Sequence, residues 1–278
     1  MMDRDDEVER PIRVVVFTSG PVLERGVQQF LYRLEAHPQI ALLACIAQSK
    51  LYSRRAVYAE LWRRRGFLAA LILLAQWASA AWRFIRSPRR ELKFRRRLGA
   101  LADRIHFVAD IHAQPTLDLV ARLQPDLGLI YGSPILKPAL FEIPTSGTLG
   151  IHHGKVPEYR GKKTMFWAMY NGEPTAGVTI QKVNAGLDTG QIVKEGEVPA
   201  RHRFPRAVWN DLDALGLDLY IQAILEVRAG TATFQPQAGR KGRLYRDPST
   251  GEIIELWRRI FTREVKDCLK TINRRMTE

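Results

Sequence analysis

The residues of this sequence that are best suited to chemistry are His152, His153 and Asp188. His152 ends a short apolar run, where we expect a strand to give way to a loop, and Asp188 follows in a loop bounded by glycines. A histidine titrates near neutral pH and can move protons, and a nearby carboxylate can fix its tautomer and stabilise its charged form. The pattern predicts proton transfer by His152 and Asp188, although each residue alone could instead make a backbone hydrogen bond or an Asx turn.

A loop rich in glycine, proline and cations follows the two histidines. From Gly154 to Gly161 it reads GKVPEYRG, which favours neither helix nor strand. Arg160, Lys162 and Lys163 are candidates for binding a phosphate of the substrate, although a solvated basic loop would have the same sequence. The chain has no Cys/His spacing typical of zinc, and we expect no metal site.

Strands and helices that alternate along the chain must position these residues. Apolar runs predict strands at Ile12–Thr18, Ile40–Ala47, Ile105–Val108, Leu127–Tyr131, Leu149–His152, Ala176–Val183 and Gln191–Val198. Helical spacing predicts helices at Val22–Ala36, Thr116–Leu123, Thr164–Asn171, Ala207–Ala229 and Glu252–Met276. This order predicts an α/β sheet, and His152, at a strand end, is expected to face the ligand. No Gly-x-Gly-x-x-Gly follows the first strand, so a dinucleotide fingerprint is absent.

The segment from residue 51 to residue 104 interrupts this alternation with a concentration of positive charge. Between Lys50 and Arg104 there are 15 lysines and arginines against three acidic residues, in a chain whose formal net charge is +14. Such a local excess predicts an anionic partner, which we expect to be phospholipid, a phosphorylated substrate or nucleic acid.

Gly66–Trp82, inside this segment, carries no charge over 17 residues and is flanked by arginines. A helix of that length spans about 25 Å, less than the ~30 Å hydrocarbon core of a bilayer. Three interpretations remain open: a buried or dimer-forming helix, a helix in the membrane interface, and a spanning helix. We expect residues 62–97 to contact an anionic membrane surface. We expect the protein to be cytoplasmic, and this contact would hold it on the inner face of the membrane. Apolar helices outside the core make a homodimer reasonable.

Three stretches around the candidate residues resemble the folate-dependent formyltransferase family: VPEYRG, WAMYNGE and AGVTIQKVNAGLDTGQIV. The resemblance covers about residues 105–200 and extends to residues 12–48. It implies a Rossmann-like open sheet of the formyltransferase type over residues 1–204, in which residues 51–104 form a basic, apolar helical insertion. Residues 205–278 would form a small, mostly helical C-terminal extension.

The resemblance also implies an activity, the transfer of a formyl group from 10-formyl-tetrahydrofolate to a primary amine. It assigns the family's proton-shuttling histidine to His152 and its orienting aspartate to Asp188. The residues that it implies for folate binding are Tyr131, Gly132, Ser133, Pro134, Ile135, Asn184, Ala185, Gly186 and Leu187.

One residue of the family's site is missing. The family has an asparagine two positions before its histidine, and that position is Gly150 here. In the family the asparagine amide helps to hold the formyl oxygen as it becomes an oxyanion, and losing such a donor costs about 2.7–4 kcal/mol. Three resolutions are open: His153 donates instead, a water or backbone amide fills the space, or the protein is weakly active or inactive.

The acceptor that we expect is an amino sugar on a nucleotide or lipid carrier. A methionyl-tRNA acceptor is less favoured, because the residues after Val198 look mostly helical, whereas tRNA formyltransferases usually carry a C-terminal β-barrel. Two other functions stay open. One is hydrolysis of formyl-tetrahydrofolate, and the other is a degenerate, non-catalytic module that binds a nucleotide sugar or a partner protein.

Overall fold

The computed structural model describes residues 10–20, 23–49, 96, 99, 101–238 and 242–262. The chain divides into two compact units, residues 1–148 and residues 149–278. Gly66–Trp82 and most of the predicted insertion lie outside the described residues. Among the helices that are described, none is both long enough and apolar enough to cross a bilayer.

A parallel sheet with the order β3-β2-β1-β4 forms the core of the first unit. Its strands are β1 (Ile12–Ser19), β2 (Ile40–Gln48), β3 (Ile105–Val108) and β4 (Leu127–Ile130). Residues 14–17 of β1 are completely buried, and burial on both faces explains why this run is continuously apolar. The four strands predicted here are confirmed to within one residue at each end.

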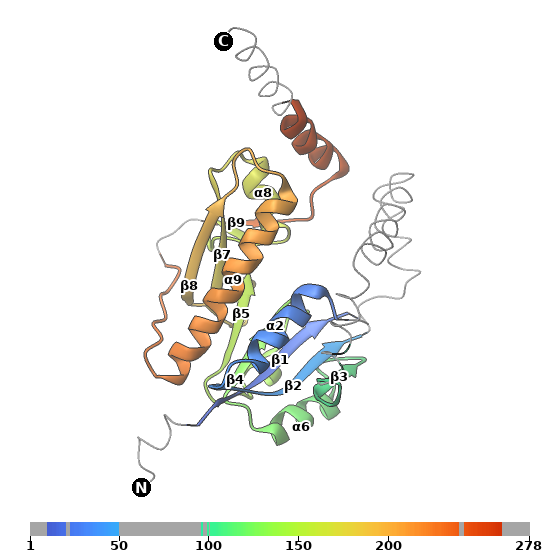
Figure 1. The fold of residues 1–278 in the computed structure, drawn as a ribbon, viewed down its shortest axis with the longest axis vertical. Helices are drawn as coiled ribbons and strands as arrows, with labels where there is room; N and C mark the ends of the chain where they lie inside the picture. The colour runs from blue at the N-terminus through green and yellow to red at the C-terminus, as the bar shows by residue number, and fades with distance from the viewer. Residues whose placement is uncertain are drawn as a thin grey trace. The chain divides into compact units, whose positions relative to one another are not determined.

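The described part of this unit also holds the helices α2 (Arg25–Glu35) and α6 (Gln114–Leu123), which Figure 1 labels. It further holds the short α7 (Pro138–Phe141) and a 3-10 turn at Ala102–Arg104. The buried positions of α2 have the spacing of an amphipathic helix: Val27, Phe30, Leu31 and Leu34. α2 starts later than predicted, because Glu24 is an extended N-cap residue. α6 starts earlier than Thr116, because Pro115 fits the first turn of a helix, where its missing N–H is not needed.

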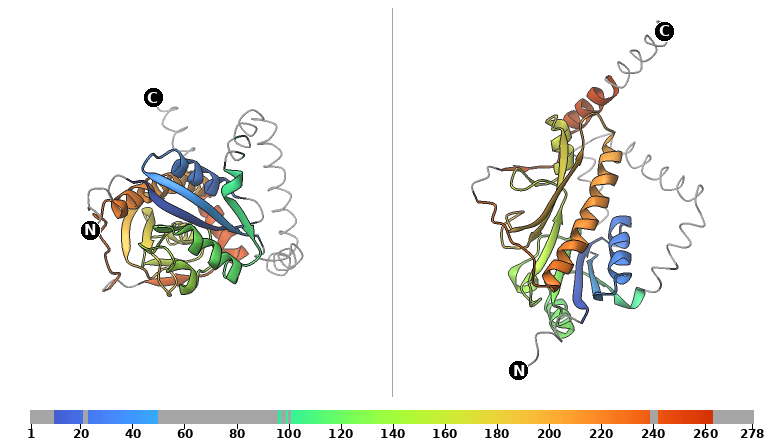
Figure 2. Two further views of the ribbon diagram at one scale, coloured as in Figure 1. Left: turned by 90° about the horizontal axis from the view of Figure 1, so that it is seen from below. Right: turned by 60° about the vertical axis from the view of Figure 1, so that its left-hand side comes forward.

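The second unit is built on antiparallel strands in the order β5-β7-β8. These are β5 (Thr148–His152), which begins at the unit boundary, β7 (Thr175–Lys182) and β8 (Ile192–Pro199). Helix α9 (Pro205–Arg228) lies along this sheet, as Figures 1 and 2 show. Gly216 permits the close approach, because a Cβ there would lie 2.8 Å from the Ile151 side chain and 2.9 Å from that of Val178.

A two-stranded parallel sheet, β6 (Tyr159–Gly161) with β9 (Arg243–Tyr245), lies in the same unit, together with α8 (Thr164–Tyr170). The expectation that Gly154–Gly161 forms no strand is therefore wrong for its last three residues. These residues gain their hydrogen-bonding partner from a segment far along the chain, which a local sequence pattern cannot reveal.

The predicted α/β class is confirmed, with the helical tail observed over residues 250–262 and its remainder outside the described residues. The domain boundary expected between residues 204 and 205 stays a prediction. α9, which begins at that point, contributes Val208 and Leu212 to one hydrophobic core with Val178 of β7 and Val198 of β8.

Candidate active site

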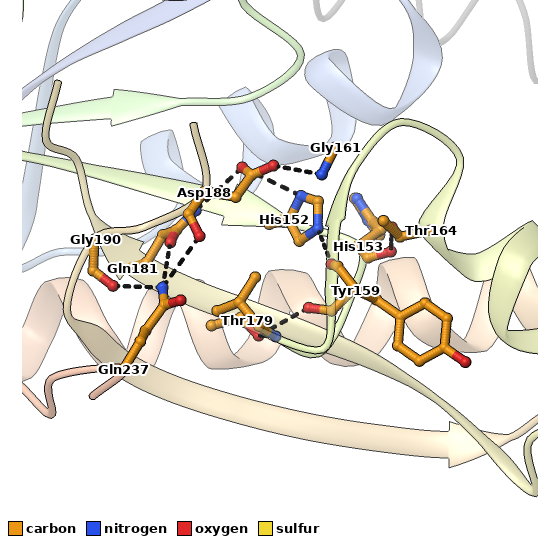
Figure 3. Close-up of polar contacts among 12 residues, drawn as sticks. His152, His153, Tyr159, Gly161, Thr164, Thr179, Gln181, Asp188, Gly190 and Gln237 are labelled. Carbon is orange, nitrogen blue, oxygen red and sulfur yellow. Dashed lines mark hydrogen bonds and ion pairs between the residues drawn. The ribbon is translucent and has the colours of Figure 1, made fainter. Parts of the chain in front are cut away.

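His152 is the last residue of β5, and its imidazole lies between two oxygen atoms (Figure 3). Nδ1 is 3.4 Å from Oδ1 of Asp188, and Nε2 is 2.8 Å from the carbonyl oxygen of Tyr159. Both side chains are largely buried, with 11% of His152 and 15% of Asp188 exposed. The structure thus brings together the two residues for which the sequence predicts proton transfer.

The charge state of His152 follows from its surroundings. Burial lowers the pKa of His152 below its usual 6.5, whereas the Asp188 carboxylate and the Tyr159 carbonyl act in the opposite direction. A carbonyl oxygen only accepts, so the proton of the neutral ring is on Nε2. Nδ1 then faces the carboxylate without a proton, and one more proton would create an ion pair with Asp188 while Nε2 keeps its hydrogen bond to Tyr159.

Two donors hold the Asp188 carboxylate in place. The backbone N–H of Gly161 donates to Oδ2 at 2.8 Å, and Nε2 of Gln181 donates to Oδ1 at 3.3 Å. The first donor comes from β6 and the second from β7. The orientation of the carboxylate toward His152 therefore depends on two separate strands.

The loop that carries Asp188 is organised by its own side chains. Asn184 Oδ1 accepts from the N–H of Gly186 and the hydroxyl of Thr189, and its Nδ2 donates to the Thr189 carbonyl. Asp188 has φ +52°, and a Cβ at Gly190 would lie 1.6 Å from a carbonyl oxygen of β7. Residues 184–187, which the resemblance implies for folate binding, are exposed.

Gln237, which the sequence analysis did not select, completes this arrangement. Its Nε2 lies 2.7 Å from the Gly190 carbonyl, 3.2 Å from the Asp188 carbonyl and 3.3 Å from Oε1 of Gln181. One amide group therefore bridges the Asp188 loop and the neighbouring strand. Gln181 lies inside the AGVTIQKVNAGLDTGQIV stretch without standing out there, although a glutamine inside the apolar β7 sequence is a weak signal of a buried polar role. Gln237 lies beyond the stretches that resemble the family, and no local pattern marks it.

His153, the other predicted catalytic residue, is engaged elsewhere. Its Nε2 is 3.2 Å from Oδ1 of Asp213, and its ring stacks on Trp209 with the centroids 4.5 Å apart. Thr164 donates a hydrogen bond to the His153 carbonyl, which fixes the backbone at this point. Successive side chains of a strand point to opposite faces, so His153 points toward α9 and not toward the His152–Asp188 pair.

The three predicted phosphate-binding residues differ in their surroundings. Lys162 forms an ion pair with Asp247 at 3.1 Å, and Lys163 is the N-cap residue of α8 with φ +54°. Nε of Arg160 is buried, and no acceptor in the described part of the chain forms a hydrogen bond with it. The role of these three residues in binding phosphate stays a prediction.

The residues predicted to bind folate after β4 belong to the first unit. Tyr131 is buried and stacks on Phe30, and the Ser19 hydroxyl donates to the Gly132 carbonyl. Ser133 donates to the Pro134 carbonyl at 2.7 Å, and Ile135 is 71% exposed. Their role in folate binding stays a prediction. In neither unit do three or more described His, Cys, Asp or Glu residues form a group that could hold a metal ion.

Comparisons with known proteins agree with this geometry. The model of the formyl transferase family matches residues 108–223, a stretch that contains His152, Asp188 and Gln181. Methionyl-tRNA formyltransferase from Thermodesulfovibrio yellowstonii is 34% identical over 120 residues, and that from Syntrophus aciditrophicus is 32% identical over 123 residues. The matches cover 42% and 44% of this chain but only 39% of each relative's length.

Solved structures show the fold. A sugar N-formyltransferase from a Shewanella species superposes with a TM-score of 0.55 and 14% identity, covering 84% of this chain and 76% of that one. A phosphoribosylglycinamide formyltransferase from Bacillus halodurans gives 0.54 and 15%, covering 77% of this chain and 94% of that one. The model of the formyl transferase family thus matches residues 108–223 of this chain, and the His152–Asp188 pair lies inside that stretch.

Proposed function

We propose that this protein transfers a formyl group from 10-formyl-tetrahydrofolate to a primary amine. The observation that carries the proposal is the buried contact between His152 and Asp188, within the stretch that matches the family. A buried base of this kind removes the proton that an amine must lose when it attacks a carbonyl carbon.

The chemistry follows from Nδ1 of His152, which carries no proton in the neutral ring and can therefore accept one. Attack by the amine forms a new C–N bond and shifts electrons onto the formyl oxygen. The amine proton goes to the His152–Asp188 pair, where the imidazolium is bonded to the Asp188 carboxylate and the Tyr159 carbonyl. When the bond to the leaving nitrogen breaks, the pair returns its proton to that nitrogen, and the C=O bond is restored.

The folate donor supplies the formyl group on a nitrogen that can leave. The residues at hand fit such a donor, because the exposed residues 184–187 lie directly before Asp188 in the same loop. A flat, polar ring system can bind to backbone groups of this kind at low cost in side-chain entropy.

We propose an amino sugar on a nucleotide or lipid carrier as the acceptor. Both carriers bring phosphate groups, and the guanidinium of Arg160, in the basic loop after the two histidines, is a candidate donor for one of them. Methionyl-tRNA is the second candidate, because the relatives at 34% and 32% identity carry that name. The same guanidinium could receive a tRNA phosphate, so the acceptor must be identified by turnover.

A formyl-transfer assay with 10-formyl-tetrahydrofolate tests the proposal. The acceptors are nucleotide-linked amino sugars, lipid-linked amino sugars and methionyl-tRNA, and formate release without acceptor is measured in parallel. We expect turnover with an amino sugar that His152→Ala abolishes and that His37→Ala, a change in the turn after α2, leaves intact. Formate release alone would identify a hydrolase, and the absence of turnover and folate binding would identify a non-catalytic module.

We further propose that residues 62–97, which lie mostly outside the described residues, bind an anionic membrane surface. The support is the concentration of arginine on both sides of an uncharged, tryptophan-containing stretch. Such attachment would bring the site to a lipid-linked acceptor on the cytoplasmic face.

A further inference from the structure

Gly150 lies on β5 directly opposite Gln181 on β7. The side-chain amide that the family has at the position of Gly150 is therefore faced here by the amide of Gln181. The two strands are antiparallel, and the next pair on the same face is His152 with Thr179. Residues that are directly opposite in such a ladder share a face, with Cβ positions about 4.5–5.5 Å apart. The face that carries His152 therefore carries the Gln181 side chain across from the position where Gly150 has none.

The Gln181 carboxamide reaches the catalytic pair itself. Its Nε2 is 3.3 Å from Oδ1 of Asp188, and the same oxygen is 3.4 Å from Nδ1 of His152. Gln181 is only 7% exposed, so this polar group is buried in the site (Figure 3). Because Gln181 and His152 both contact Oδ1 of Asp188, the amide nitrogen of Gln181 lies beside the imidazole of His152.

The orientation of this amide follows from its two neighbours. The Asp188 carboxylate only accepts, so the Gln181 atom that faces it is the nitrogen, and Oε1 of Gln181 faces Nε2 of Gln237 at 3.3 Å. Nε2 of Gln237 shares its two protons among this oxygen and the carbonyls of Asp188 and Gly190. An amide nitrogen carries two protons, and the bond to Asp188 uses one of them.

We propose that Gln181 supplies the donor to the formyl oxygen that Gly150 cannot supply, an inference that rests on the proposed formyl transfer. The second proton of Gln181 Nε2 binds the oxygen as electrons move onto it, and the bond weakens when the C=O bond is restored. A neutral amide suits this role, because it can donate to the Asp188 carboxylate and to a developing oxyanion without being ion-paired. His153 is thereby not needed as a substitute, in agreement with its contacts to Asp213 and Trp209.

The test replaces Gln181 by methionine, which is similar in length and has no N–H. We expect kcat for formyl transfer to fall about 10²–10³-fold in Gln181→Met while KM for the folate changes less than about threefold. Gln114→Met is the matched control, because Gln114 also donates to an aspartate, Asp118 at 2.8 Å, on the surface of α6. That variant should retain wild-type kcat.

A binding measurement separates a donor to the oxyanion from a merely structural residue. The probes are 5,8-dideazafolate and its derivative with an aldehyde at the formyl position, which hydrates to a tetrahedral diol. The wild type should prefer the tetrahedral probe, and Gln181→Met should lose that preference by at least about tenfold while binding the plain probe equally well. If Gln181→Met does not fold, Gln181→Glu, which keeps the acceptor for Gln237, is judged by the same criteria.

Unchanged kcat in the variant, or a retained preference for the tetrahedral probe, would overturn the inference alone. A wild-type protein that neither transfers formyl groups nor binds either probe would overturn the proposed function, and the inference with it. Partial recovery of kcat when Gly150→Asn is added to Gln181→Met would support it further, because the lost donor would return from the opposite strand.

Discussion

His152 is held by opposing effects. Burial destabilises its charged form, whereas a carboxylate on one side and a carbonyl on the other are arranged to accept hydrogen bonds from that form. The first effect favours the neutral ring, and the second favours the protonated ring that the proposed transfer requires. With burial alone the histidine would be unable to hold the proton. With the two acceptors alone it would be charged before the proton arrives. Either case would make it a poorer proton shuttle.

The pH dependence of kcat/KM should report this balance. Since the pKa of His152 is lowered, we expect kcat/KM to rise with pH through a pKa below 6.5 and then to level off before neutrality. Asp188→Asn removes the charge that raises this pKa, so the acidic limb should shift to still lower pH while kcat falls about 10²–10⁴-fold. An acidic limb at or above 6.5 in the wild type would contradict this description of the site.

Gly190 is the residue in the Asp188 loop that tolerates substitution least. A Cβ there would meet the Lys182 carbonyl oxygen at 1.6 Å, so backbone atoms must move. We expect Gly190→Ala to lower the free energy of unfolding by about 1–3 kcal/mol and to reduce turnover. Gly251→Ala is the control, because nothing lies within 4 Å of a Cβ there, and alanine in that helix should add up to about 1 kcal/mol. Equal effects of the two changes in chemical denaturation would refute the argument.

At the scale of elements, the site is assembled from strands rather than from one motif. β5 presents His152, β6 and β7 hold the Asp188 carboxylate, and the segment between α9 and β9 provides Gln237. A change in the Asp188 loop therefore alters hydrogen bonds to residues that are distant in sequence.

Removal of the Gln237 amide should show this dependence. Gln237→Leu keeps a side chain of similar length but leaves the carbonyls of Asp188 and Gly190 without this donor. We expect the free energy of unfolding to fall by about 1–3 kcal/mol and kcat to fall more than KM rises, because the carboxylate is less well oriented. Gln235→Leu is the comparison, since Gln235 pairs with Ile192 through its backbone only. Wild-type kcat in Gln237→Leu would show that the hydrogen bonds within the Asp188 loop are enough to orient the carboxylate.

The same organisation explains what the sequence could predict. His152 and Asp188 stand in motifs with local spacing, and the strands that carry them have apolar patterns, so their positions were predicted and the structure brings them together. Gln181, Gln237 and the pairing of β6 with β9 depend on contacts between distant segments, which no local pattern encodes. The orientation of His153 toward Asp213 and Trp209 was missed for the same reason.

At the scale of the whole molecule, the family match ends before several residues that the site needs. Residues 108–223 include the catalytic pair, whereas Gln237 and β9 lie beyond them. The positive charge is also unevenly distributed along the chain, because 15 of its cations fall between residues 50 and 104. The proposed membrane attachment therefore rests on residues outside the matched stretch.

Vesicle binding tests that property. The full-length protein should sediment with vesicles that contain anionic phospholipid and not with purely zwitterionic ones, and high salt should release it, since each cation near the surface contributes about 1 kcal/mol. Deletion of Gly66–Trp82 should abolish sedimentation, and replacing Arg63, Arg64 and Arg65 by glutamine should weaken it. Equal partitioning of the full-length and deleted proteins would refute the membrane proposal.

The position of Gln237 has a consequence for proteolytic control. Residues 231–238 form an irregular, half-exposed stretch that is paired with the edge of β8 through Gln235 and Ile192. A protease that cut the chain just before this stretch would leave every residue of the family match intact, yet it would remove the covalent anchor on one side of the amide that bridges Asp188, Gly190 and Gln181. We expect nicking at this point to lower turnover before the protein unfolds, so that turnover reports the damage earlier than a melting curve.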